Sequence, residues 1–194
     1  MNCDLGERGI ANPIDDQILK YIDIANIACG GHAGDQQSVD YYTKLCRDNN
    51  IKITAHISYP DTANFGRTVM DISNSNLVRS FDDQLALFDN IKSIKPHGAL
   101  YNELNINKAL AKTFIDWCLN NDINELILSP NGAVIDYATQ NNIQIITESF
   151  VERGYMLDYN NNPTLIPKGQ TNAEISDVVH ALDQYVELNS GNIT

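Results

Sequence analysis

Short apolar segments alternate with amphipathic segments along this chain, and that alternation is the feature that most constrains its fold. Residues 26–35 show the pattern: an apolar run ends at two glycines, His32 sits on the turn, and Gly34-Asp35 precedes an amphipathic run. In α/β proteins such strand–turn–helix units place ionisable side chains at the carboxyl ends of parallel strands. The alternative interpretation is a tight turn with Asp35 as a helix N-cap and a solvated His32.

About six short segments are expected to be strands, with helices between them: residues 1–3, 21–28, 51–55, 91–95, 126–128 and 143–146. Such alternation predicts a parallel sheet with right-handed crossovers. A closed eight-stranded (β/α) barrel typically takes roughly 250 residues, so the pattern leaves an open doubly wound sheet or an incomplete barrel.

Three further expectations concern the second half of the chain. Ser129 and Pro130 have the pattern of an N-cap followed by the first residue of a helix. Residues 150–170 are expected to form a long loop. Thr171 and Glu174 have capping-box spacing, which predicts a final helix over residues 171–188 with His180 off its apolar stripe.

Length and composition predict a single globular domain over the 194 residues. The formal net charge of −12 argues against nucleic acid and anionic membranes as partners. No segment has the apolar length of a membrane span, and the N-terminus lacks the features of a signal peptide. The four cysteines form no C-x-x-C pair, so we expect reduced thiols in a cytoplasmic protein.

Ionisable side chains follow most of the expected strands. His32, His56 and His97 follow three successive strands, and Asp4 follows the first. Because parallel strands end at one edge of a sheet, we expect these four side chains to converge on one pocket. The candidate catalytic residues are Asp4, Glu7, His32, His56, Lys95 and His97, and further candidates at this edge are Arg67, Glu148 and Arg153.

Two mechanisms fit this set of residues. Asp4, His32 and His56 could coordinate a divalent metal that activates water. Alternatively, a histidine or carboxylate acts as general base without metal, while Lys95, Arg67 and Arg153 hold an anionic substrate. Because the sequence lacks an H-x-x-x-H motif, we expect weak or absent metal dependence. Purely structural roles are also open: Asp4 capping a turn, Arg67 pairing with Asp61, and Arg153 pairing with Glu152.

Six segments together resemble the LamB/YcsF family. They are NCDLGE (2–7), ANIACGGHAGD (25–35), AHISYPD (55–61), NFGR (64–67), KPHGALYN (95–102) and ERGY (152–155). The resemblance runs in the same order from residue 2 to about the final expected helix. It adds Asn26 and Tyr101 to Arg67, Glu148 and Arg153 as candidate substrate-binding residues.

The resemblance implies an irregular (β/α) barrel related to the metal-dependent polysaccharide deacetylases. The family contains the A subunit of the prokaryotic ATP-dependent 5-oxoprolinase, so the implied reaction is opening of the 5-oxoproline (pyroglutamate) lactam to glutamate. Subunits B and C are the implied partners. The sequence has no P-loop, so ATP is expected to be bound mainly by those subunits.

The chain departs from the family pattern at both ends, where it lacks residues before the first motif and a further strand and helix after the last. We therefore expect an incomplete barrel of about six strands whose open edge is covered by self-association or by the final helix. The alternative functions are a metal-dependent deacetylase-like hydrolase and a truncated, non-catalytic binding subunit.

Overall fold

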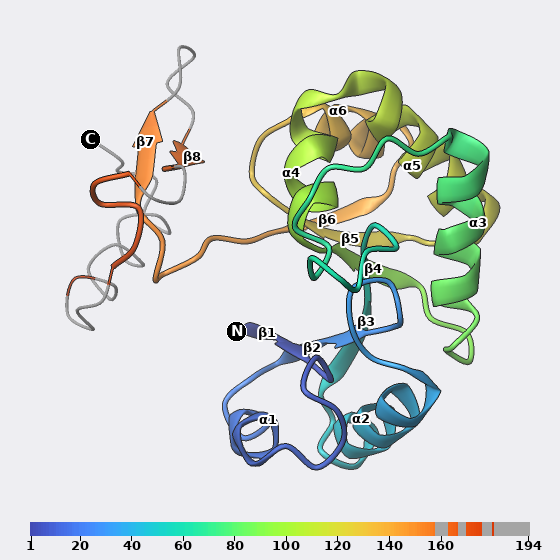
Figure 1. Cartoon of the computed structure of the whole chain (residues 1–194), viewed down its shortest axis with the longest axis vertical. Coiled ribbons are helices and arrows are strands. Elements are labelled where there is room, and N and C mark those ends of the chain that lie inside the picture. Colours follow the sequence, from blue (N-terminus) through green and yellow to red (C-terminus); the bar gives the residue numbers. More distant parts are fainter. Residues whose placement is uncertain (158–162, 167–169, 176–179, 181–194) are drawn as a thin grey trace. The chain divides into compact units, whose positions relative to one another are not determined.

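The computed structural model describes residues 1–157, 163–166, 170–175 and 180 (Figure 1). They divide into two compact units. The first comprises residues 1–128 and 132–146, and the second comprises residues 129–131 and the described residues from 147 onward. The expectation of one domain over residues 1–194 stays a prediction.

A six-stranded sheet with its strands in sequence order forms the framework. The strands are β1 (Asn2–Leu5), β2 (Ile24–Ala28), β3 (Lys52–Ile57), β4 (Ser93–Pro96), β5 (Glu125–Leu128) and β6 (Gln144–Thr147). They run parallel and curl into a half-barrel (Figure 1). A doubly wound sheet would reverse its strand order at a switch point. The predicted incomplete α/β barrel is therefore confirmed.

Helices connect the strands and cover the outside of the sheet. They are α1 (Pro13–Ile18), α2 (Gln36–Asp48), α3 (Asn74–Leu85), α4 (Gly98–Ile106), α5 (Lys108–Asn120) and α6 (Ala133–Gln140). α2 packs on β2 and β3, α3 on β3 and α5, and α4 on β4. Tyr42, Phe81 and Phe114, from α2, α3 and α5, are the largest fully buried side chains and fix this layer.

The other face of the sheet is polar. Asp4 of β1 pairs in register with Asn26 of β2, and His56 of β3 pairs with Lys95 of β4. Successive strand residues point to opposite faces. The intervening residues belong to the hydrophobic core and include Leu5, Ile27, Ala55, Ile94 and Leu126. The strands therefore separate an apolar layer under the helices from a polar face that carries the candidate residues.

Three expectations about the second half of the chain are wrong. Helix α6 begins at Ala133, and its N-cap is Gly132, three residues after the expected cap at Ser129. Residues 150–170 contain an antiparallel pair, β7 (Tyr155–Leu157) and β8 (Pro163–Leu165), instead of a continuous loop. Residues 171–173 are turn and bend, and Glu174 forms a β-bridge with Arg153, so no capping box forms there.

Most of the expected final helix lies outside the described residues; His180, within it, is helical and exposed. Among the helices in the described part of the chain, none is long and apolar enough to cross a membrane. All four cysteines are free, and three of them are buried.

Candidate functional site

Side chains from the ends of β1 to β4 meet on the polar face of the sheet. His56 Nε2 lies 3.2 Å from Asp4 Oδ2 and 3.0 Å from His97 Nδ1. His32 stacks on His97 with ring centroids 3.7 Å apart, and its Nε2 lies 3.0 Å from Glu7 Oε1. The structure thus brings together the four side chains expected to converge, those of Asp4, His32, His56 and His97. We call Asp4, Glu7, His32, His56, Lys95 and His97 the histidine cluster.

Each member is positioned where a strand gives way to a turn. Asp4 and His56 lie within β1 and β3, while Glu7 lies in the turn after β1. His97 follows β4 directly and is the N-cap residue of α4, although its side chain makes no capping bond. His32 follows the Gly30-Gly31 turn and is buried, so the interpretation as a solvated histidine is wrong. The other half of that interpretation, Asp35 as the N-cap of α2, is confirmed.

A polar network holds the Asp4 carboxylate. Lys95 Nζ lies 3.0 Å from Asp4 Oδ1, and Asn26 Nδ2 donates to the same oxygen at 2.9 Å. Asn2 Oδ1 accepts from Asn26 at 2.8 Å and from Lys95 at 3.3 Å. Because these bonds occupy Oδ1, Asp4 presents its other oxygen to His56. Asp4 is therefore held as part of the site and not as a turn cap.

Two backbone carbonyls fix the protonation of facing imidazoles. His56 Nδ1 lies 3.0 Å from the carbonyl oxygen of Lys95, and His97 Nε2 lies 3.0 Å from that of Phe65. A carbonyl oxygen can only accept, so both of these ring nitrogens carry the proton. In the neutral rings, His56 Nε2 and His97 Nδ1 are therefore both unprotonated, and they face each other.

The loop between β3 and α3 closes over the histidines. The Phe65 ring contacts His32 and His97 edge to face, with centroid separations of 5.1 and 5.5 Å. The Arg67 guanidinium lies over Phe65, 5.1 Å from its centroid. An exposed Arg67 therefore stands beside the cluster, with its guanidinium stacked on an aromatic ring.

Gly66 is required for this closure. Its φ is +64°, and a Cβ there would lie 2.9 Å from His32 Cβ and 3.1 Å from His97 Cδ2. Its carbonyl oxygen accepts from the backbone N–H of Ala99 at the start of α4. The loop backbone thus packs directly on two imidazoles, which a side chain at this position would prevent.

Burial and charge set the protonation states. Burial raises the pKa of Asp4, but His56 and Lys95 outweigh it and hold that pKa well below its usual range. Burial also raises the pKa of Glu7, but the hydrogen bond with His32 and the electrostatic effects of His56 and His32 together outweigh it and lower that pKa. Burial lowers the pKa of His32, and burial together with the neighbouring histidines lowers that of His97 to about 3. At neutral pH the site thus combines carboxylates with neutral imidazoles at His32 and His97.

A set of metal-ligand type also exists in the cluster. One atom each from Glu7, His32, His56 and His97 lies within 4.8 Å of every other. The metal-binding alternative from the sequence used Asp4 with His32 and His56. In the structure Asp4 lies beside this set of four residues, and its carboxylate contacts His56 Nε2.

The remaining candidates have different surroundings. Tyr101 is buried on α4, and its backbone N–H donates to the His97 carbonyl. Glu148 and Arg153 belong to the second unit. The Arg153 guanidinium donates to the carbonyl oxygens of Ala173 and Ile166, and these bonds organise that unit. Substrate binding by these three residues stays a prediction.

Sequence reasoning missed two residues that shape the site. Asn2 alternates with Asp4 on β1, so the two-residue period of a strand could have placed both on the polar face. Phe65 lies in the N-F-G-R segment, but no sequence signal shows that its carbonyl accepts from His97.

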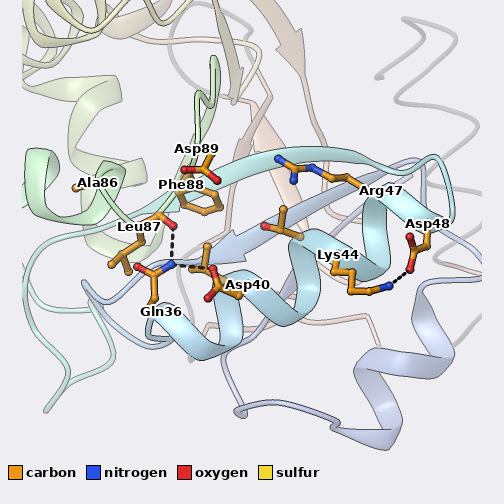
Figure 2. Close-up of a pocket in the computed structure, with 11 residues that line it drawn as sticks. Gln36, Asp40, Lys44, Arg47, Asp48, Ala86, Leu87, Phe88 and Asp89 are labelled. Atoms are coloured by element: carbon orange, nitrogen blue, oxygen red, sulfur yellow. Dashed lines mark hydrogen bonds and ion pairs between the residues drawn. The ribbon is translucent and has the colours of Figure 1, made fainter.

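A separate pocket of about 310 Å³ lies between α2 and residues 86–89 (Figure 2). Gln36 spans it, donating to Asp40 Oδ1 and to the Leu87 carbonyl, and Lys44 pairs with Asp48 on its rim. No member of the histidine cluster lines this pocket. The candidate catalytic residues therefore lie in the histidine cluster and not in this pocket.

Comparison with known proteins agrees with this geometry. The LamB/YcsF family model matches residues 1–194. Two proteins named as the A subunit of 5-oxoprolinase, from Haemophilus influenzae (strain PittEE) and Pyrococcus abyssi, are each 32% identical over 97% of this chain, covering 78% and 76% of their own lengths. The fold matches the crystal structure of a lactam utilization protein from Thermus thermophilus, with a TM-score of 0.85, 24% identity, and coverage of 97% of this chain and 79% of that one. The chain belongs to the LamB/YcsF family.

Proposed function

We propose that this chain catalyses hydrolytic opening of the 5-oxoproline lactam to L-glutamate, coupled to ATP hydrolysis, as the A subunit of a complex with subunits B and C. Family membership and the names of the relatives support this choice of substrate and partners. The observation that carries the proposal is the buried contact of His56 with Asp4 and His97, which places proton acceptors at the carboxyl edge of the sheet.

Lactam hydrolysis requires activation of a poor electrophile. In the proposed reaction the ring amide oxygen takes the γ-phosphoryl group of ATP, and a water oxygen then adds to the ring carbon. The C–N bond breaks as the nitrogen takes a proton, and a second water releases phosphate from the resulting acyl phosphate. The products are glutamate, ADP and phosphate.

The histidine cluster contains groups that can accept a proton and a group that can stabilise negative charge in this reaction. The Asp4 and Glu7 carboxylates and the neutral His97 can accept the proton of the attacking water. The Lys95 ammonium, 3.0 Å from Asp4 Oδ1, provides positive charge for the oxygen that becomes negative.

The substrate's own carboxylate needs a cation. The exposed Arg67 beside the cluster can hold it through two parallel hydrogen bonds. Asn26 and Tyr101 are proposed to bind the substrate as well, and substrate binding by Glu148 and Arg153 is proposed on the family resemblance alone. ATP is proposed to bind mainly to the partner subunits, because this sequence contains no P-loop.

A reconstitution assay tests the proposal. The purified chain is mixed with subunits B and C, ATP and 5-oxoproline, and both glutamate and ADP are measured. We expect equal amounts of the two products, dependent on all three subunits. Glutamate formation by B and C alone at the full rate, or ADP release without glutamate, would contradict it.

A further inference from the structure

We infer that Glu7, His32, His56 and His97 form a binding site for one divalent first-row transition metal ion, of the zinc type. This inference deepens the proposed function and rests on it only for the chemical role of the ion, because binding itself needs neither ATP nor partner subunits.

The direction of the hydrogen bonds leaves two lone pairs opposed. His56 donates from Nδ1 to the Lys95 carbonyl, and His97 donates from Nε2 to the Phe65 carbonyl. The two remaining ring nitrogens, His56 Nε2 and His97 Nδ1, lie 3.0 Å apart, and the lone pair of each points at the same location. Histidines that ligate metals commonly donate their second ring N–H to a carbonyl in this way, which fixes the ring and aims the other nitrogen.

A single proton cannot satisfy all the hydrogen-bond acceptors that meet here. A proton on His56 Nε2 would face two acceptors at once, His97 Nδ1 at 3.0 Å and Asp4 Oδ2 at 3.2 Å. Glu7 Oε1 lies 4.0 Å from His56 Nε2 and 3.8 Å from His97 Nδ1, so it adds a third acceptor on the same side. A metal cation differs from a proton because it bonds to several lone pairs simultaneously.

The distances fit a small ion. A tetrahedral zinc ion with bonds of about 2.0–2.1 Å holds its ligand atoms about 3.3–3.4 Å apart. The two closest pairs here, His56 with His97 and Glu7 with His32, are both at 3.0 Å, and all four atoms lie within 4.8 Å. Side-chain shifts of a few tenths of an ångström to about one ångström would make the set tetrahedral.

The donor set selects the kind of ion. Three imidazole nitrogens and one carboxylate oxygen suit zinc and its neighbours, whereas magnesium and calcium prefer oxygen ligands. Among the described residues nothing bonds to His32 Nδ1, so this ring can carry its proton on that nitrogen and offer Nε2 to the ion.

The local charge also favours a cation. The Asp4 and Glu7 carboxylates stand against one ammonium group, that of Lys95. These three groups sum to one negative charge, which a divalent ion held among three largely buried imidazoles would more than offset. When bound, such an ion supplies Lewis-acid polarisation and a water of lowered pKa.

Calorimetric titration of the chelator-treated chain with ZnSO₄ tests the inference. We expect one ion per chain with a Kd below about 1 μM, and no saturable binding of MgCl₂ at the same concentrations. Co²⁺ as a substitute should give the intense visible absorption of a tetrahedral site. No binding of either transition ion, or binding without a fixed stoichiometry, would overturn the inference.

Variants locate the ion. His56→Gln and His97→Gln should each weaken Zn²⁺ binding by at least about 100-fold, whereas His180→Gln removes an exposed histidine and should leave it unchanged. Glu7→Gln should likewise weaken Zn²⁺ binding. Glu152→Gln removes an exposed carboxylate and is its control. Far-UV circular dichroism checks that each variant is folded. Equal affinity in the cluster variants and their controls would overturn the site.

The outcome separates the two proposals. Stoichiometric Zn²⁺ binding with no glutamate formation in the complex would retain the metal site and reject the proposed function. Glutamate formation at an undiminished rate by the metal-free chain would reject the metal's role and retain the function.

Discussion

At the scale of single residues, two carbonyl oxygens determine what the histidine cluster can do. By accepting from His56 Nδ1 and His97 Nε2, the carbonyls of Lys95 and Phe65 leave the opposite nitrogen of each neutral ring without a proton. Neither carbonyl could be assigned this role from the sequence, because every residue has one. The sequence shows which residue types gather at an edge, whereas the direction of their hydrogen bonds depends on the folded backbone.

Gly66 gives a residue-scale prediction about stability. Gly66→Ala should lower the free energy of unfolding by about 1–3 kcal/mol, because φ is +64° and the added Cβ would approach His32 and His97. Gly9→Ala is the matched control, with φ +81° and nothing within 4 Å of the added Cβ. Denaturant unfolding measures both variants. Equal losses would show that the clash with the imidazoles contributes nothing.

Acid sensitivity is predicted at the same scale. The pKa of His97 is about 3 in the folded chain, against an ordinary 6.5, so between these values the unfolded chain binds a proton that the folded chain excludes. The free energy of unfolding should therefore fall as pH drops from about 6.5 toward 3, by up to about 1.4 kcal/mol per pH unit from this residue. The lowered carboxyl pKa values of Asp4 and Glu7 act in the same direction nearer pH 4.

Denaturant titrations from pH 7 to 4, with a chelator present, measure this slope. His97→Gln should make it shallower, and His180→Gln should leave it as in the parent chain. A His97→Gln slope as steep as the parent's would contradict a buried neutral His97.

At the scale of elements, the N-terminus of α2 offers a defined test. Asp35 accepts from the Ser38 N–H at 2.9 Å, and Ser38 Oγ accepts from the Asp35 N–H at 2.8 Å. Asp35→Ala removes this cap and should cost about 0.5–2 kcal/mol in unfolding free energy. Asp40→Ala, on the exposed face of the same helix, should cost less than about 0.5 kcal/mol. The account of this turn fails if the two variants unfold at the same denaturant concentration.

The sequence predicted elements well where apolar periodicity is strong and ends at glycine or a polar turn. The strand that became β2 and the helix that became α2 are examples. It failed where the chain has weak patterning. α4 starts at Gly98 without a side-chain cap, and β7 and β8 have three residues each, so neither periodicity nor capping reveals them.

Strand order also explains how much of the site was predictable. Parallel strands bring their carboxyl ends to one edge, so the meeting of Asp4, His32, His56 and His97 followed from strand order. The positions of Glu148 and Arg153 did not follow, since the chain beyond β6 departs from the strand–helix repeat.

At the scale of the whole molecule, the described sheet has two edges, β1 and β6. An uncovered edge leaves unpaired backbone groups, and each Å² of exposed apolar surface costs roughly 25 cal/mol, so a few hundred Å² cost several kcal/mol. That is comparable with the stability of a small domain. We therefore predict that self-association covers the apolar surface at these edges.

Light scattering measures the mass of the protein in solution. Cover by self-association should appear as a dimer or a larger species. A folded monomer at high concentration would contradict the prediction.

The central claim is that the histidine cluster is the site of lactam hydrolysis, and the rate of glutamate formation by the reconstituted complex tests it most directly. Asp4→Asn keeps the shape of the side chain that contacts His56 and Lys95 but removes its charge. This variant should lower kcat by at least about 100-fold, while Asp40→Asn on the surface of α2 should leave kcat within about 2-fold of the parent chain. A folded, complex-forming Asp4→Asn variant that makes glutamate at the parent rate would place the chemistry elsewhere.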